Sequence, residues 1–499
     1  MDEVEKVIRE EVTSLYISII LLVFPLVYGD GLFNITQIKY TVYMRTTLVY
    51  FILIFFMSIT YYIRNKFDKV EIFLFAMIAA WCVSLYFSFD RYECFIGNQH
   101  KKTGLLFYII AILTAIIIRK NLKWKTSMTW CLIASTGIVS LLQILNRWGI
   151  DPLGYWSQVS ETDQPWYIST LGQINYNAAF VCLTLSIVIC MFILCREKRK
   201  KIIFGTVMVI GFAGGICCCA DGFYVGMLVA FLIVFAYACI KPKFWKEAWS
   251  LCLCWWIANA MISILYNFLP GNNTGIWGVS EKILDIKVIA LETVLLIAFY
   301  LVVRFGNEFL EKNALWIKRI YAGIISLMCL VPAVLFIVAT WQNFPENHPL
   351  HWFVFNEQWG TNRGSIWIKA VKLFEESDII HKLFGYGHNM VALSLSEVLG
   401  INKGGIVIAD MHNTYLNMLI TSGIIGLILF LIAMIYLLKN GIRLIKENKE
   451  SGLFVVAGTG TYLAQALING PQSITSPIVL LGFGIFLGII FNNSDNKIE

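Results

Sequence analysis

Two residues in one polar stretch, Arg363 and His412, could do phosphate and proton-transfer chemistry. They lie in the segment 342–413, the one long polar excursion in a chain made largely of apolar runs. A planar guanidinium near the start of a helix, where backbone N–H groups are free, suits phosphate oxygens. A histidine just before an apolar helix faces the positive end of the helix dipole, which keeps the imidazole neutral and able to accept a proton. The pair predicts phosphate binding and general-base catalysis at a membrane surface.

Each of these residues also has a plainer interpretation. Arg363 could extend to lipid headgroups from a short helix that lies in the membrane surface. His412 could be an ordinary interfacial polar side chain, with Asp410 serving as the helix N-cap. The short helix would present one apolar face, made of Ile366, Trp367, Ala370, Val371 and Phe374.

Further polar side chains stand at the ends of apolar runs or near Arg363 in the sequence. His388 follows Gly385 and Gly387 in a turn that could fold back over the site. A polar side chain at the mouth of a span is costly against lipid, so it is expected to face the bundle interior. The candidate substrate-binding residues are Asn175, Asp221, Lys369, Lys372, His388 and Asn413.

The sequence gives little support for a metal centre. It has no HxxxH or HExxH spacing. The run Cys217, Cys218, Cys219 lacks metal-ligand spacing, because adjacent residues on a helix point in different directions. We therefore expect neither a metal nor another cofactor.

The elements that position these residues are predicted to be membrane spans. The chain has 499 residues, of which 58% are hydrophobic and 14% charged, whereas ordinary globular proteins have about 25% charged residues. Apolar runs of roughly 17–22 residues recur, each long enough to cross the hydrocarbon core as a helix. The composition predicts an all-α, polytopic bundle of about 12–14 spans with one large extracytoplasmic loop that contains short interfacial helices.

The fourteen spans that we delimit are listed here by residue range. They are 14–29, 46–63, 71–88, 104–118, 127–146, 173–195, 202–218, 222–240, 250–269, 284–303, 320–341, 414–438, 452–469 and 474–491. This divides the chain into a bundle over 1–341 with outer loops 89–103 and 147–172, a catalytic loop over 342–413, and C-terminal helices over 414–499.

The positive charges assign a direction to this bundle. With a cytoplasmic amino terminus, about 26 of the 39 Lys and Arg residues fall in inner segments, as the positive-inside rule requires. This distribution accounts for the net charge of +7 without nucleic acid as a partner. It predicts a multi-pass protein of the cytoplasmic membrane, with both termini cytoplasmic and the segment 342–413 outside.

The order of these motifs resembles the superfamily of O-antigen ligases and O-antigen polymerases. The best match runs from Arg363 through Gly426: Arg-x-x-x-Trp, Gly-x-Gly, His-Asn-x-x-Leu, and Gly-x-x-Gly in the next span. Weaker matches are Ser88-Phe89-Asp90 with Gly97 and Gly104, and the run from Leu171 to Asn175. One departure is Ala220-Asp221-Gly222, where many members carry Ser-Arg-Gly. A second phosphate-holding arginine is then missing, and Lys369, Lys372, Arg91 or Lys101 would have to replace it.

The resemblance implies a glycan transferase that acts on the outer face of the bacterial cytoplasmic membrane. Its donor would be an oligosaccharide on a polyprenyl diphosphate such as undecaprenyl diphosphate, and its acceptor a glycan or lipid-linked hydroxyl. Carried over by position, Arg363 would hold the diphosphate and His412 would activate the acceptor. Polymerase and ligase both stay open. An alternative function is that of a multi-pass transporter or flippase of lipid-linked glycans, because Asp285 and Glu292 are two acidic residues within one span. A third alternative is a structural scaffold without activity.

Overall fold

The computed structural model describes residues 2–29, 34–64, 67–98, 101–268, 274–401 and 408–492. Residues 99–100 of the expected outer loop 89–103, residues 402–407 of the segment 342–413, and residues 493–499 of the C-terminal region lie outside this range.

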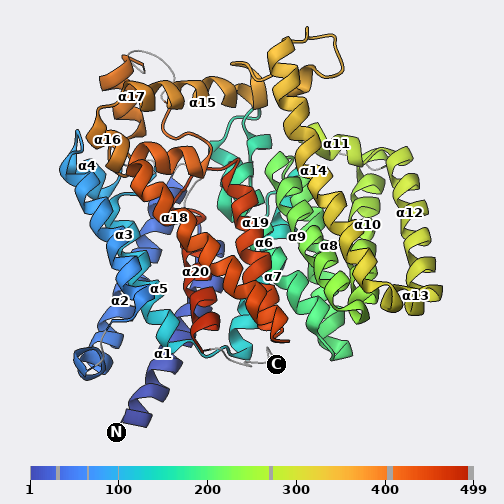
Figure 1. Ribbon diagram of the computed structural model, residues 1–499, viewed down its shortest axis with the longest axis horizontal. Helices are drawn as coiled ribbons and strands as arrows, with labels where there is room; N and C mark the ends of the chain where they lie inside the picture. The colour runs from blue at the N-terminus through green and yellow to red at the C-terminus, as the bar shows by residue number, and fades with distance from the viewer. Residues whose placement is uncertain are drawn as a thin grey trace.

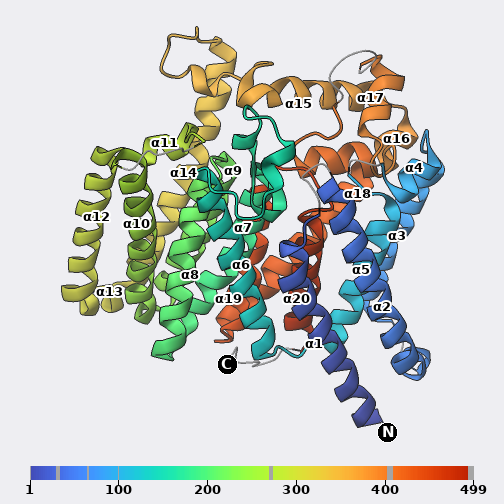
Figure 2. The same ribbon diagram turned by 180° about the vertical axis from the view of Figure 1, so that it is seen from behind.

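The described chain is an all-α bundle with one two-stranded hairpin, β1 (Tyr167–Ile168) with β2 (Gly172–Gln173) (Figures 1 and 2). The α-helices are α1 (Asp2–Leu26), α2 (Ile35–Arg64), α3 (Lys69–Tyr86), α4 (Arg91–Ile96), α5 (Leu105–Asn121), α6 (Thr126–Arg147), α7 (Ile174–Leu194), α8 (Lys198–Cys217), α9 (Asp221–Ile240), α10 (Trp245–Phe268), α11 (Gly278–Ile283), α12 (Ile286–Phe305), α13 (Asn307–Lys312), α14 (Ala314–Gln342), α15 (Trp359–Glu376), α16 (Ile379–Phe384), α17 (Val391–Leu399), α18 (Thr414–Lys446), α19 (Ser451–Ala466) and α20 (Ser476–Asn492). Short 3₁₀ turns are η2 (Tyr155–Gln158), η3 (Gln164–Trp166), η4 (Ser169–Leu171), η5 (Pro242–Phe244) and η6 (His351–Phe353).

The long helices have the length and apolarity of membrane spans. Within the described residues, ten helices are long and apolar enough to cross a bilayer. Each of the fourteen predicted spans overlaps a helix, but α1, α5, α19 and α20, which run alongside the other ten, are not among those counted as long and apolar enough (Figures 1 and 2). The prediction of an all-α polytopic bundle is therefore confirmed.

The two ends of the bundle differ in character. The segments between α14 and α18, including the horizontal helix α15, cover one end, and the amino terminus lies at the other (Figure 1). The end that holds the amino terminus carries clusters of Lys and Arg residues, several of which pair with acidic side chains. Arg119 contacts Asp68 at 2.6 Å, Lys120 contacts Glu71 at 2.6 Å, and the carboxylate of Glu71 is fully buried. The end that carries α15 is called the α15 end below.

Helix α18 is broken, and a glycine turn fills the break. Gly423 has φ 65° and ψ −172°, which interrupts the helical hydrogen bonds. The carbonyls of Ile420 and Thr421 instead accept from the N–H groups of Tyr386 and Gly387, both at 2.9 Å. A broken helix within a membrane protein requires such replacement partners. The Gly-x-Gly motif thus has a structural role, since it inserts its backbone beside the break.

A second, smaller core joins the α15 end to the bundle. Its fully buried members come from α4, α15, the Gly-x-Gly turn, α17 and α18: Cys94, Ala370, Leu373, Tyr386, Met390, Val391, Leu395, Met411 and Ile420. Ile366 and Phe374 pack against it, as the predicted apolar face implies. Val371, assigned to that face, is 48% exposed, whereas Leu373, which was not assigned to it, is fully buried.

Replacing Gly385 should weaken this junction. Gly385 has φ 76°, and a Cβ there would collide with the backbone of Thr421 and Ser422. We expect Gly385→Ala to cost about 1–3 kcal/mol, the usual cost of a strained backbone, and to lower the thermal unfolding midpoint of the protein in detergent. Gly323→Ala is the matched control, because a Cβ at Gly323 meets no atom within 4 Å. Equal midpoints for the two variants would contradict this account.

Candidate functional site

His412 and Arg363 lie close enough at the α15 end for the charge of one to act on the other. Partial burial and the charges of Lys101 and Arg363 lower the pKa of His412 to about 4. The side chain of His412 is 47% exposed, so the two cations matter for this shift as well as burial. The imidazole is therefore neutral at pH 7 and accessible to a reactant. Both properties are required of a general base.

Arg363 reaches the site from the first regular turn of α15. The three residues before it, Gly360 to Asn362, have positive φ, so the regular helix begins at about Arg363. Trp367, one turn later, donates from Nε1 to the carbonyl of Met411 at 3.0 Å. Burial lowers the pKa of Arg363, whereas the carboxylate of Asp221 opposes this shift. Asp221, the first residue of α9, thus lies near the guanidinium.

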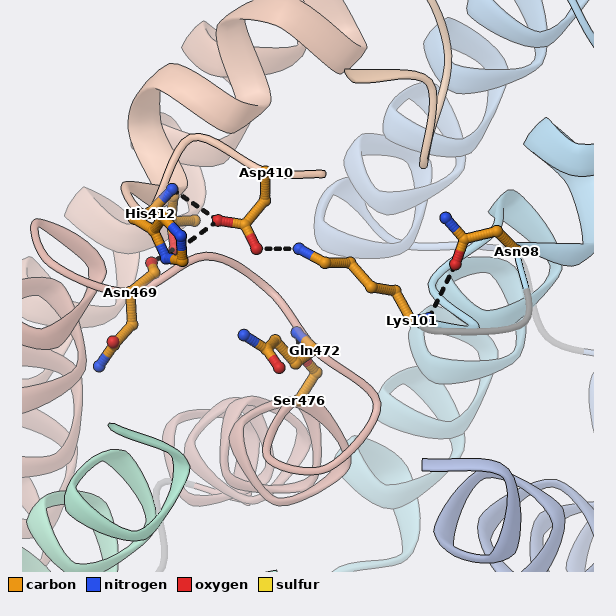
Figure 3. Close-up of polar contacts among 8 residues, drawn as sticks. Asn98, Lys101, Asp410, His412, Asn469, Gln472 and Ser476 are labelled. Carbon is orange, nitrogen blue, oxygen red and sulfur yellow. Dashed lines mark hydrogen bonds and ion pairs between the residues drawn. The ribbon is translucent and has the colours of Figure 1, made fainter. Parts of the chain in front are cut away.

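Asp410 is the acceptor that organises the loop before α18 (Figure 3). Its Oδ1 accepts from the backbone N–H of His412 at 2.6 Å and lies 3.3 Å from His412 Nδ1. Its Oδ2 forms an ion pair with Lys101 Nζ. The N-cap of α18 is Asn413, which accepts from the N–H of Leu416 at 3.0 Å. The alternative interpretation of Asp410 as the N-cap is wrong, because the helix begins three residues later than that role requires.

The turn 467–472 between α19 and α20 packs against the loop that precedes α18. Asn413 Nδ2 donates to the carbonyl of Leu467 at 3.1 Å, and Thr414 Oγ1 to that of Asn469 at 2.7 Å. Asn469 Nδ2 in turn donates to Gln465 Oε1 at 2.7 Å. The Nδ2 of Asn413 thus binds Leu467 and its Oδ1 binds Leu416, so both polar groups of this side chain hold the loop against the bundle.

A largely apolar cavity extends into the bundle below this turn. Thr414, Asn469 and Gly470 line its upper end, next to Asp410. Side chains of α3, α5, α7, α18, α19 and α20 line the rest, among them Trp81 and Tyr108. A hydrocarbon chain could occupy such a space with its polar end beside His412.

The other candidate residues lie elsewhere. His388 is 3% exposed, stacked on Tyr108 (centroids 4.4 Å apart) and edge-on to Trp81; burial lowers its pKa to about 3. It packs against two aromatic side chains that line the cavity. Asn175 lies in the first turn of α7 and is partly buried. The fully buried residue there is Asn177, whose Nδ2 donates to three carbonyls of the preceding turn.

Lys369 and Lys372 lie on other faces of α15 than Arg363. Helical geometry places them about 120° and 180° around the axis from it. Lys372 is exposed and pairs with Glu376 at 3.8 Å. Both lysines therefore point away from the side of α15 on which Arg363 lies.

Sequence reasoning missed the ion pair of Lys101 with Asp410 and the turn 467–472. Lys101 was considered only as a phosphate ligand, and nothing in the spacing of two residues 309 positions apart indicates contact. The turn carried a signal, because Asn469-Gly470-Pro471 is typical of a tight turn. Near Asp221, the fully buried Arg147 donates to the carbonyl of Cys217 at 2.8 Å. It therefore braces that turn.

The described residues include no group of three or more His, Cys, Asp or Glu side chains placed to hold a metal ion. The charged groups around the exposed imidazole are Arg363, Lys101, Asp410 and Asp221. Such an arrangement can bind an anion, through the cations, and accept a proton on the histidine.

The proximity of Arg363 to His412 can be tested without any substrate. Because the charge of Arg363 lowers the pKa of His412, Arg363→Gln should raise that pKa. The imidazole can be titrated by NMR in protein carrying ¹³C-labelled histidine, with His412→Gln used to assign the signal. Lys372→Gln removes an equal charge from another face of α15 and should leave the pKa unchanged. An unshifted pKa in Arg363→Gln would place the two side chains apart.

The comparison with known protein families covers the part of the chain that contains both residues. Residues 286–431, from α12 into α18, match the family model described as O-antigen ligase. No curated protein matches the chain. The resemblance inferred from the motifs is thereby confirmed, and the chain is a polytopic membrane protein that carries a domain of the O-antigen ligase family over residues 286–431.

Proposed function

We propose that the protein transfers an oligosaccharide from a polyprenyl-diphosphate donor to a hydroxyl acceptor on the outer face of the cytoplasmic membrane. The observation that supports it most is the neutral, accessible imidazole of His412 beside Arg363, inside the region that matches the O-antigen ligase family. The basic clusters at the opposite end favour an extracytoplasmic site by the positive-inside rule. Both termini are then cytoplasmic.

The donor would lie across the membrane boundary. Its apolar tail would enter the cavity below Thr414 and Gly470, which stabilises it by the hydrophobic effect. Its diphosphate would then lie at the level of Arg363, with the N-terminal end of α15 nearby. A guanidinium binds phosphate oxygens with two parallel hydrogen bonds. This geometry leaves the anomeric carbon of the first sugar near His412.

The reaction would be a direct displacement. The acceptor oxygen attacks the anomeric carbon as the bond from that carbon to the diphosphate oxygen breaks. His412 takes the acceptor proton, and the polyprenyl diphosphate leaves with the bonding electron pair. Arg363 stabilises the charge that develops on the leaving diphosphate, an electrostatic contribution that needs no metal. The acceptor is a glycan or a lipid-linked glycan, and repeated transfer gives a polymer.

Loss of either central side chain should abolish transfer. We expect His412→Gln to lower kcat by about 10²–10⁴-fold, the usual effect of removing a general base, and Arg363→Ala to lower kcat/KM for the donor by a similar factor. The assay is product formation by the purified protein in lipid vesicles, with a polyprenyl-diphosphate oligosaccharide as donor. Lys372→Ala serves as the control. A flippase would move the donor between leaflets without extending it, and that result would contradict the proposal.

The pH dependence should differ between free and donor-bound protein. His412 can accept a proton only when neutral, so the rate falls as the pH drops through its pKa. In the free protein that pKa is lowered to about 4. A bound diphosphate adds negative charge that favours imidazolium and raises the pKa. Since kcat/KM reports the free protein and kcat the complex, the acidic limb of kcat should lie at higher pH. Coincident limbs would contradict donor binding beside His412.

A further inference from the structure

Asp410 and Lys101 form a buried ion pair between two outer segments. The side chain of Asp410 is 6% exposed and that of Lys101 14%. Either charge alone would be costly to bury, because removing an ion from water costs several kcal/mol even after relaxation. Burial lowers the pKa of Lys101, but the carboxylate in contact with it stabilises the ammonium form. The pair is therefore a fixed feature of the site, unlike an exposed salt bridge.

Both segments are shaped to bring this pair together. The backbone N–H of Lys101 donates to Asn98 Oδ1 at 2.8 Å (Figure 3). A Cβ at Gly104 would collide with the backbone of Ile96 and Gly97, so the two ends of this turn touch. On the other side, a Cβ at Gly470 would lie only 3.0 Å from Asp410 Oδ1. A larger residue at Gly470 would push the carboxylate away from His412.

The same carboxylate fixes His412. The residue has φ 46°, a left-handed conformation that non-glycine residues adopt rarely, and its N–H donates to Asp410 Oδ1. The same oxygen lies 3.3 Å from Nδ1. A carboxylate facing Nδ1 favours the tautomer with hydrogen on Nδ1, which leaves the lone pair on Nε2. Nε2 is then the atom that accepts a proton.

We propose that Asp410 and Lys101 are positioning residues for His412: the ion pair holds the carboxylate so that Nε2 is the basic nitrogen, and the carboxylate stabilises the imidazolium after proton transfer. This inference rests on the proposed function, and it assigns Lys101 to the base instead of to the donor. A lysine that neutralises Asp410 does not need to bind phosphate. Lys101, which lies outside the region of the family match, becomes part of the active site.

The charged groups around His412 decide how each variant should behave. Lys101 and Arg363 lower its pKa, Asp410 faces it from its own loop, and Asp221 lies beyond Arg363. Lys101→Met removes a cation and leaves Asp410 unneutralised. The pKa of His412 then rises, and the acidic limb of kcat/KM should move to higher pH. Asp410→Asn removes the preference for the productive tautomer.

The experiment compares kcat, KM for the donor and pH profiles of purified variants in lipid vesicles. We expect Asp410→Asn to lower kcat by at least about 10²-fold, because an amide can hold the wrong tautomer, with KM for the donor within about twofold. Lys101→Met should lower kcat by about tenfold and shift the acidic limb upward, and Lys101→Arg should restore most of the rate. Lys102→Met removes an equal charge at the next residue, and it should neither lower kcat nor shift the acidic limb.

Other outcomes would overturn this role for the pair. If Lys101→Met raises KM and weakens binding of polyprenyl diphosphate while kcat and the acidic limb stay unchanged, Lys101 is a phosphate ligand. Wild-type kinetics for Asp410→Asn would equally exclude the role. Thermal unfolding of each variant shows whether it is folded.

The tautomer can be read in the wild-type protein, where folding and catalysis are not at issue. The ¹³C and ¹⁵N chemical shifts of the His412 ring at pH 7 should show hydrogen on Nδ1. Hydrogen on Nε2 would overturn the inference even if the protein transfers glycans. Conversely, an Nδ1–H ring in a protein without transfer activity would reject the proposed function and leave the arrangement of the three side chains intact.

Discussion

A buried carboxylate, Asp410, connects the parts of the α15 end that come from distant regions of the sequence. It binds the backbone of His412, pairs with Lys101 and lies against Gly470. Because an unpaired buried carboxylate is costly, the three segments that meet at Asp410 must assemble together. The cost of burying charge thereby specifies one arrangement of the segments that meet at Asp410. This explains how a histidine on an irregular loop can hold one orientation at a membrane surface.

The break in α18 supplies a second constraint. Membrane helices satisfy their own backbone hydrogen bonds, so an interruption requires donors from another segment. Here the donors are the N–H groups of Tyr386 and Gly387. The first half of α18, which follows His412, is thus attached to the Gly-x-Gly turn as well as to the turn 467–472. The glycines that suggested a turn folding back over the site bind the break in α18 instead, and His388 is buried in the same region.

Much of the fold was predictable because membrane spans are set by local apolarity over about 20 residues. Each of the fourteen predicted spans overlaps a helix, and ten helices are long and apolar enough to cross a bilayer. That Arg363 and His412 would lie near one another was an expectation from the family resemblance, and the charge of Arg363 does act on His412. The contact of Lys101 with Asp410 was not predictable, because it depends on how two outer turns pack, and a single sequence carries no signal for contacts between distant loops. The hydrogen bonds of Asn413 with Leu467 and Leu416 were likewise not predictable from the sequence.

The charges around His412 also suggest why a base with so low a pKa is useful. In the ligand-free site the charges of Arg363 and Lys101 oppose a proton on His412. In the proposed reaction the donor diphosphate, bound by Arg363, brings in negative charge that reduces this opposition. Proton uptake by His412 is then favoured at the moment when the acceptor must lose its proton. The basicity of His412 is therefore low until the donor is bound, which couples acceptor activation to donor binding through electrostatics alone.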